Sequence, residues 1–113
     1  IQQEANLNQD IMKFIFCTCN ISMMDQVTQL LEKNGVTSYQ LTEKVISRNE
    51  KGSPRFDTAV WPGYNVNITM QISSDDKAER IIALLREFNK EMAFSDEELL
   101  TVCSMKMDDY FFD

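Results

Sequence analysis

The sequence predicts an α+β domain in which two helices cover one face of a four-stranded antiparallel sheet. Two segments carry most of this prediction. Residues 65–73, NVNITMQIS, alternate strictly between polar and apolar side chains, which is typical of a strand with one buried face. Residues 75–92, DDKAERIIALLREFNKEM, repeat apolar residues at helical spacing behind an acidic first turn, which favours an amphipathic helix.

The elements before these two segments follow from local patterns. A first strand is expected at 11–19, IMKFIFCTC, because apolar side chains occupy both alternating faces, as in a central strand covered on both sides. Ser22 is the expected N-cap of a first helix, and Gly35 is its expected end. A second strand is expected at 36–48, where β-branched residues are frequent.

The order of elements specifies the topology. Ser73 or Ser74 is expected to cap the second helix, and 99–107, LLTVCSMKM, is expected to form the last strand. Two β-α-β units with right-handed crossovers then give a ferredoxin-like βαββαβ sandwich over residues 11–113. The polar residues 1–10 are interpreted as a flexible N-terminal extension or a remnant of the expression vector, outside this domain.

Two helices cover only one face of such a sheet. We expect the uncovered face to carry Ile11 or Ile15 together with Cys17 and Cys19, beside Asn and Gln side chains of the third strand. An apolar strip with polar surroundings is typical of an interface, so the sequence predicts self-association through this face. The alternative is a monomer whose aromatic tail, 108–113, folds back over the sheet.

Composition excludes several classes of function. The chain has 113 residues and a formal net charge of −7, which argues against binding to nucleic acid or to an anionic membrane surface. No stretch is long and apolar enough for direct membrane insertion. The absence of histidine removes the commonest general base, so we do not expect an enzyme. Three cysteines form no disulfide framework, which favours a reducing, cytoplasmic setting.

Part of the chain resembles the nitrogen-regulatory PII-like family. Residues 12–36, MKFIFCTCNISMMDQVTQLLEKNGV, are similar to its first strand and helix, including the closing GV. Residues 42–52, TEKVISRNEKG, match the length of its TE…RQKG segment, and the similarity resumes at 65–73. The resemblance implies a homotrimer with the sheets turned inward, adenine nucleotides between subunits, and a loop that reaches a partner protein such as a transporter or an enzyme.

The nucleotide-binding features of that family are replaced here. Arg48 stands where the family has a glycine, and Asn49 and Glu50 replace its arginine and glutamine. Residues 91–100, EMAFSDEELL, contain no glycine and four carboxylates, where the family has a glycine-rich segment with lysine. Phosphate groups bind where backbone N–H groups can approach them, so these residues argue against an adenine nucleotide held in the family's manner.

The connector 48–64 occupies the position of the family's partner-contacting loop and is rich in aromatic residues. Large aromatic side chains and arginine anchor interfaces and ligand pockets. The expected ligand- or partner-binding residues are Arg48, Asn49, Arg55, Phe56, Trp61 and Tyr64. The sequence thus favours a regulatory or sensory trimer that binds a small ligand in the cleft between subunits. In the alternative interpretation, Trp61 and Tyr64 only pack on a neighbouring subunit, and the trimer is purely structural.

A metal site is the other alternative. Cys17 and Cys19 point to one face of their strand, and the last strand would bring Cys103 next to them. Three thiolates suit Cu(I) or Zn(II), and the same trimeric scaffold serves the CutA copper-tolerance family. Packing as small hydrophobic side chains is the simpler explanation of these cysteines. Carboxylates that could hold a hard cation are Asp96, Glu97, Glu98, Asp108 and Asp109.

Overall fold

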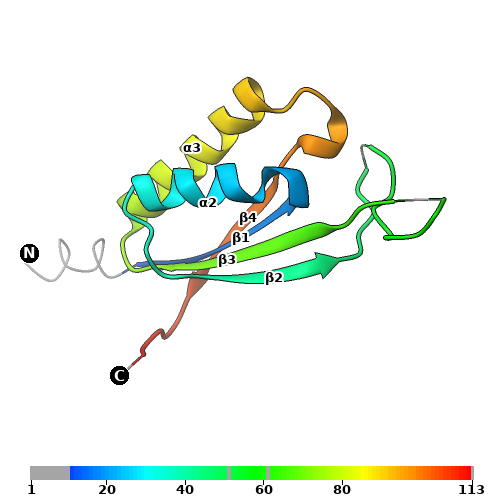
Figure 1. The fold of residues 1–113 in the computed structure, drawn as a ribbon. Helices are drawn as coiled ribbons and strands as arrows, with labels where there is room; N and C mark the ends of the chain where they lie inside the picture. Colours follow the sequence, from blue (N-terminus) through cyan, green and yellow to red (C-terminus); the bar gives the residue numbers. More distant parts are fainter. Residues whose placement is uncertain (1–10, 51, 61, 113) are drawn as a thin grey trace, which may run out of the picture.

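The computed structural model describes residues 11–50, 52–60 and 62–112, so the expected N-terminal extension lies outside the described residues. Two α-helices and four strands make up most of it, with two short 3₁₀ turns (Figure 1). The elements are β1 (Met12–Asn20), η1 (Ile21–Met23), α2 (Met24–Lys33), β2 (Tyr39–Val45), β3 (Asn65–Ile72), α3 (Asp75–Met92), η2 (Asp96–Glu98) and β4 (Thr101–Met107).

The sheet has the strand order β2-β3-β1-β4, and every neighbouring pair is antiparallel. Both helices lie on the same face (Figure 1). This is the ferredoxin-like βαββαβ arrangement, so the predicted fold class is confirmed. The second helix matches its expected range, whereas β2 is shorter than the expected 36–48.

Strand register decides which side chains enter the core. Ile15 pairs with Met70 and Cys17 pairs with Ile68, and directly paired residues point to the same face. All four are fully buried beneath the helices. The helices contribute apolar side chains of their buried faces: Met23, Val27, Leu31, Ala78, Ile81, Leu85 and Phe88.

The expected composition of the uncovered face is therefore wrong for β1. Ile15, Cys17 and Cys19 lie under the helices, and Phe14 and Phe16 belong to the uncovered face instead. Both alternating sets of residues 11–19 are apolar, so periodicity within that segment could not separate them. Pairing with β3 separates them, because its polar and apolar sets are distinct.

The helix ends show two confirmed predictions and one wrong prediction. Ser74 caps α3, and its Oγ accepts the Lys77 N–H at 3.4 Å. The cap at the first helix is Asn20 rather than Ser22: the Asn20 Oδ1 accepts the Ser22 N–H at 3.0 Å and starts the turn η1. Gly35 ends the segment after α2 with a φ of 88°, as expected.

No helix within the described part of the chain combines the length and the hydrophobicity that a membrane crossing requires.

Candidate functional site

The segment between β2 and β3 spans residues 46–64, two residues more than the expected connector 48–64, and the name connector is used for it from here on. It leaves the sheet at the end of β2 and returns at β3, beyond the helices (Figure 1). Pairing between the two strands is irregular between Thr42 and Val45, and Lys44 has a φ of 59°. An irregularity of this kind bends a strand and disrupts its pairing, and beyond it only Val45 of β2 pairs, with Asn65. The connector thus begins as a separate structure rather than as a longer hairpin.

Two backbone contacts close the connector into successive lobes. Ser47 and Arg55 form an antiparallel bridge, with N···O distances of 3.0 and 2.8 Å. The Asp57 N–H then donates to the Gly63 carbonyl at 2.9 Å, and Asp57 has a φ of 56°. The sequence analysis did not predict the bridge between Ser47 and Arg55.

Arg55 fastens the connector to the end of β1. Its Nη2 donates to the Asn20 Oδ1 at 2.9 Å, the same oxygen that starts η1. Gly63 lies against the guanidinium, and a Cβ at that position would lie 2.5 Å from Nη2. Only a glycine leaves room for this contact, and its φ of 88° also favours glycine. We refer to Arg55, Asn20 and Gly63 as the arginine clasp.

The buried polar atoms near the clasp are not all paired. Asn65 is 4 % exposed, and its Nδ2 donates to the Ser47 hydroxyl. Among the described residues, the Asn65 Oδ1 and the Arg55 Nε have no hydrogen-bond partner. One is an acceptor and the other a donor, so a polar group with both functions would satisfy them.

A second attachment joins the connector to the turn η2. The Ser53 N–H donates to a Glu97 carboxylate oxygen at 2.9 Å, and Gly52 packs against the backbone of Asp96 and Glu97. The bond from Ser53 lowers the pKa of Glu97 below its ordinary value. The Asn20 side chain also reaches the Glu97 carbonyl, at 3.3 Å. Asn20 and Glu97 thus connect three segments of the site.

A cavity of about 320 Å³ lies between this connector and the start of β4. Asn49 and Glu50 of the connector line this cavity, together with Asp96 and the residues 99–101 at the start of β4. Two carboxylates at the cavity disfavour phosphate, in agreement with the sequence argument against an adenine nucleotide.

The predicted site residues divide into three groups. Arg55, Phe56 and Tyr64 are half-buried at the base of the connector, whereas Arg48 and Asn49 are exposed. Trp61 lies outside the described residues. The sequence reasoning missed Asn20, Gly63 and Glu97. The helix-start pattern at NISMM could have suggested Asn20, but nothing in the sequence links it to Arg55.

The cysteines do not converge within one chain. Cys103 pairs with Phe16 and is exposed, whereas Cys17 and Cys19 are buried on the opposite face. Burial raises the pKa of the Cys17 thiol far above its ordinary value and that of Cys19 to about 11. Metals bind the thiolate form, which this burial disfavours. Among the described residues, no group of three or more Cys, Asp or Glu side chains is placed to hold a metal ion.

The uncovered sheet face carries an apolar strip along β1 and β4. Its members are side chains of the uncovered set in both strands: Met12, Phe14, Phe16, Cys103, Met105 and Met107. Met105 is 56 % exposed. The β3 side of the face is polar, with Thr69 and Gln71 bonded to Gln40 of β2. The uncovered face thus has the composition of an interface.

The aromatic tail covers part of this face only. Tyr110 and Phe112 line a cavity of about 480 Å³ with Gln40 and Gln71, at the polar side. The Phe112 side chain is still 90 % exposed. The apolar strip is therefore not sealed by the tail.

Comparisons with known proteins identify the fold. No protein-family model matches the chain, and no curated protein sequence matches it significantly. Among solved structures, CPII from Thiomonas intermedia K12 bound to ADP and bicarbonate is similar at a TM-score of 0.63 and 11% identity, over 88% of this chain and 90% of that one.

Two further solved structures agree. CPII from the same organism bound to ADP, AMP and bicarbonate gives a TM-score of 0.61 at 11% identity, over 89% of this chain and 97% of that one. A PII-like signalling protein from Thermus thermophilus gives 0.57 at 18% identity, over 86% and 87% of the two chains. The resemblance expected from the sequence is confirmed in structure: at low sequence identity, this chain has the fold of the PII-like proteins.

Proposed function

We propose that the chain is a regulatory or sensory protein of the PII-like type that acts as a homotrimer, by binding rather than by catalysis. The trimer would form through the uncovered sheet face, with the apolar strip on its axis. A small ligand would bind between subunits beside the connector, order it, and change its contact with a partner protein such as a transporter or an enzyme.

The arginine clasp is the observation that carries this proposal. It fixes the base of the connector at one end of the sheet, next to the cavity lined by Asn49, Glu50 and Asp96. Anything that binds beside the clasp and competes for Arg55 or Asn65 changes how the connector is held. The proposed ligand is a small polar molecule that can both donate and accept hydrogen bonds, because the Arg55 Nε and the Asn65 Oδ1 are buried without a partner among the described residues.

The structural neighbours supply the first molecules to test. CPII has been described with ADP, AMP and bicarbonate. Bicarbonate offers both a donor and acceptors, and its single negative charge is disfavoured less by the carboxylates of the cavity than the several charges of ADP or AMP. We therefore expect a response to bicarbonate or a similar small oxyanion to exceed any response to ADP or AMP.

The experiment combines mass and ligand response. Multi-angle light scattering is expected to give three times the monomer mass. Trp61, the single tryptophan of the sequence, reports on the connector through its fluorescence. A ligand at about 100 times its Kd adds roughly 2.7 kcal/mol to the free energy of unfolding, which a thermal-shift assay detects.

Matched variants locate the response. Arg55→Ala is expected to abolish the fluorescence and thermal responses, whereas Arg86→Ala, an exposed arginine on α3, is expected to keep both. A monomeric chain would refute the trimer. A ligand response that survives Arg55→Ala would place binding elsewhere. A response to Cu(I) or Zn(II) that Cys103→Ser removes would favour the metal alternative.

A further inference from the structure

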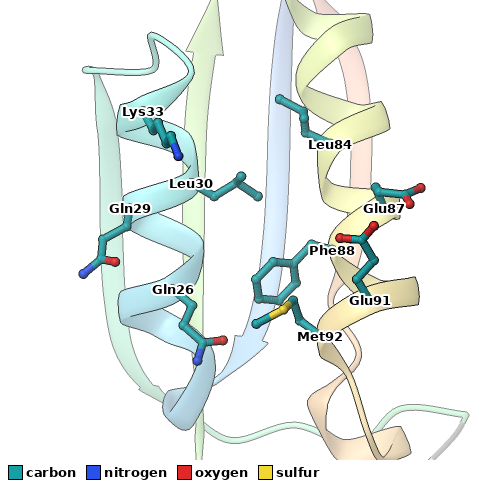
Figure 2. Close-up of a pocket in the computed structure, with 9 residues that line it drawn as sticks. All are labelled: Gln26, Gln29, Leu30, Lys33, Leu84, Glu87, Phe88, Glu91 and Met92. Atoms are coloured by element: carbon teal, nitrogen blue, oxygen red, sulfur yellow. The ribbon is translucent and has the colours of Figure 1, made fainter.

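A groove lies between the two helices, on the side of the sheet opposite the apolar strip. It has a volume of about 380 Å³ and is formed by α2 on one side and α3 on the other (Figure 2). It is separate from the connector and its cavity, which share none of its lining residues. An occupant of this groove would leave the uncovered sheet face free for self-association.

The floor of the groove is apolar. Leu30 of α2 and Phe88 and Met92 of α3 point into the space between the helices (Figure 2). Phe88 is 7 % exposed and belongs to the core, whereas Met92 is 38 % exposed. Leu30 and Leu84 are half-buried and pack against the same core. The floor is thus an apolar surface that packs against the core and ends at the exposed Met92. The flexible methionine side chain can adapt to different partners.

The α3 rim of the groove is acidic. Glu87 and Glu91 both line the groove and lie one helical turn apart. Like charges at this spacing destabilise a helix slightly, and a cation placed beside them would relieve the repulsion. Within the described part of the chain, neither carboxylate takes part in an ion pair. The facing rim carries the uncharged Gln26 and Gln29 and the cation Lys33, so the negative charge of the groove lies on α3 alone (Figure 2).

Charge also excludes the most exposed apolar segment of this chain as the occupant. The aromatic residues Phe111 and Phe112 follow closely on Asp108 and Asp109. A tail from a second copy would bring these carboxylates toward Glu87 and Glu91. A cationic occupant avoids this repulsion, and the net charge of −7 further favours its approach.

From these observations we infer that the α2–α3 groove binds a basic amphipathic helix of a partner protein. Helix-in-groove recognition places apolar residues at positions i, i+3, i+4 and i+7 into such a floor. Lysine or arginine residues one turn apart on the flank of that helix would then meet Glu87 and Glu91. This surface goes beyond the proposed ligand site, because it needs neither the connector nor the trimer.

The test uses two fluorescently labelled synthetic helical peptides with an identical leucine stripe. One carries lysines on a single flank, and the other carries glutamates at the same positions. Fluorescence anisotropy with the full chain is expected to show the lysine peptide binding about tenfold more tightly, with an affinity that falls as salt rises. Equal binding of both peptides would overturn the inference.

Variants that remove equal charge inside and outside the groove distinguish binding to the groove from attraction of the peptide to the net negative charge of the chain. Glu87→Gln with Glu91→Gln is expected to weaken the lysine peptide about fivefold, the effect of two exposed ion pairs. Glu43→Gln with Glu79→Gln removes the same charge outside the groove and is expected to change binding by less than about twofold, because distant charges are screened. Equal losses from the two pairs would show attraction to net charge alone and overturn the inference.

The apolar floor is tested by Met92→Gln, at a position exposed enough for the chain to keep its fold. This variant is expected to weaken binding of the lysine peptide about tenfold, because it places a polar side chain in the apolar contact. Amide chemical-shift changes on adding the peptide are expected in α2 and α3. Changes confined to the strands of the uncovered face, or to the connector, would refute the groove as the binding surface.

Discussion

The two faces of the sheet are built from the same strands but are completed in different ways. Under the helices, Ile15, Cys17 and Ile68 are fully buried by side chains of the chain itself. On the other face, Phe14 and Phe16 are only half-buried, and Met105 is exposed. The connector fastens one end of that face through polar bonds, and the aromatic tail reaches its polar side. The comparison teaches that a face rich in apolar groups can remain unsealed within one chain.

The largest expected effect tests the sealed face. Ile15→Ala removes a fully buried side chain from the core and is expected to lower the free energy of unfolding by about 3 kcal/mol. Denaturation in urea, at a protein concentration where the assembly state is known, measures this change. Phe14→Ala on the neighbouring position is the control, because its loss should depend on protein concentration if copies seal that face. A concentration-independent loss of the same size at Phe14 would contradict the difference between the faces.

The next prediction tests the unsealed face. Phe16→Asp places a carboxylate in the middle of the apolar strip, and burying an unpaired charge is strongly unfavourable. We expect the proposed trimer to dissociate while circular dichroism still shows a folded chain. Sedimentation velocity measures the dissociation. Gln71→Asp, at the polar side of the same face, should disturb the assembly less. A trimer that survives Phe16→Asp would exclude this face as the interface.

A smaller effect is expected at the end of the face that the connector fastens. Gly63→Ala forces the Arg55 guanidinium away from Asn20 and strains the backbone, which is expected to cost about 1–2 kcal/mol. Gly35→Ala is a close control, because it has the same φ of 88° and open space for a Cβ, with the nearest atom 3.7 Å away. The difference between the two variants, measured by chemical denaturation, isolates the arginine clasp. Equal costs would show that the clasp contributes nothing.

The smallest effect concerns pH. The pKa of Glu97 is lowered in the folded chain because its carboxylate accepts the Ser53 N–H. Its stabilising contribution is therefore present above the pKa of an unfolded glutamate, about 4.3, and is lost as the pH falls through the lowered folded value. The Ser53 amide resonance is expected to shift with a midpoint below that of exposed glutamates. Glu97→Gln should remove this titration. A midpoint at the ordinary value would show that the bond does not form.

How far the sequence predicts this molecule depends on whether the signal is local. The strict alternation of 65–73 and the helical stripe of 75–92 gave the right elements, because each pattern carries its own period. The prediction of which β1 side chains lie on the uncovered face was wrong, because both sides of this strand are apolar and only its pairing with β3 distinguishes them. The prediction of the fold class was still correct, because the order of the elements does not depend on which β1 side chains face the helices.

The site was harder to predict because its contacts connect distant segments. Arg55 was expected to bind something, but its observed partner Asn20 lies 35 positions earlier in the chain. Glu97 meets Ser53 across 44 positions, and the sequence offered it only as one of several carboxylates. Such pairings follow from the fold as a whole. Residue types in the sequence therefore indicated candidate site residues, but not which of these residues contact one another.

The two hydrogen-bonded closures of the connector have a consequence for how this molecule can vary. Once Asp57 and Gly63 are held together, the stretch between them begins and ends at fixed points. Lengthening a loop between fixed ends costs little, on the order of 0.6 kcal/mol for each doubling of its length. Insertions or exchanged residues there are therefore expected to leave the sheet and the bridge between Ser47 and Arg55 intact.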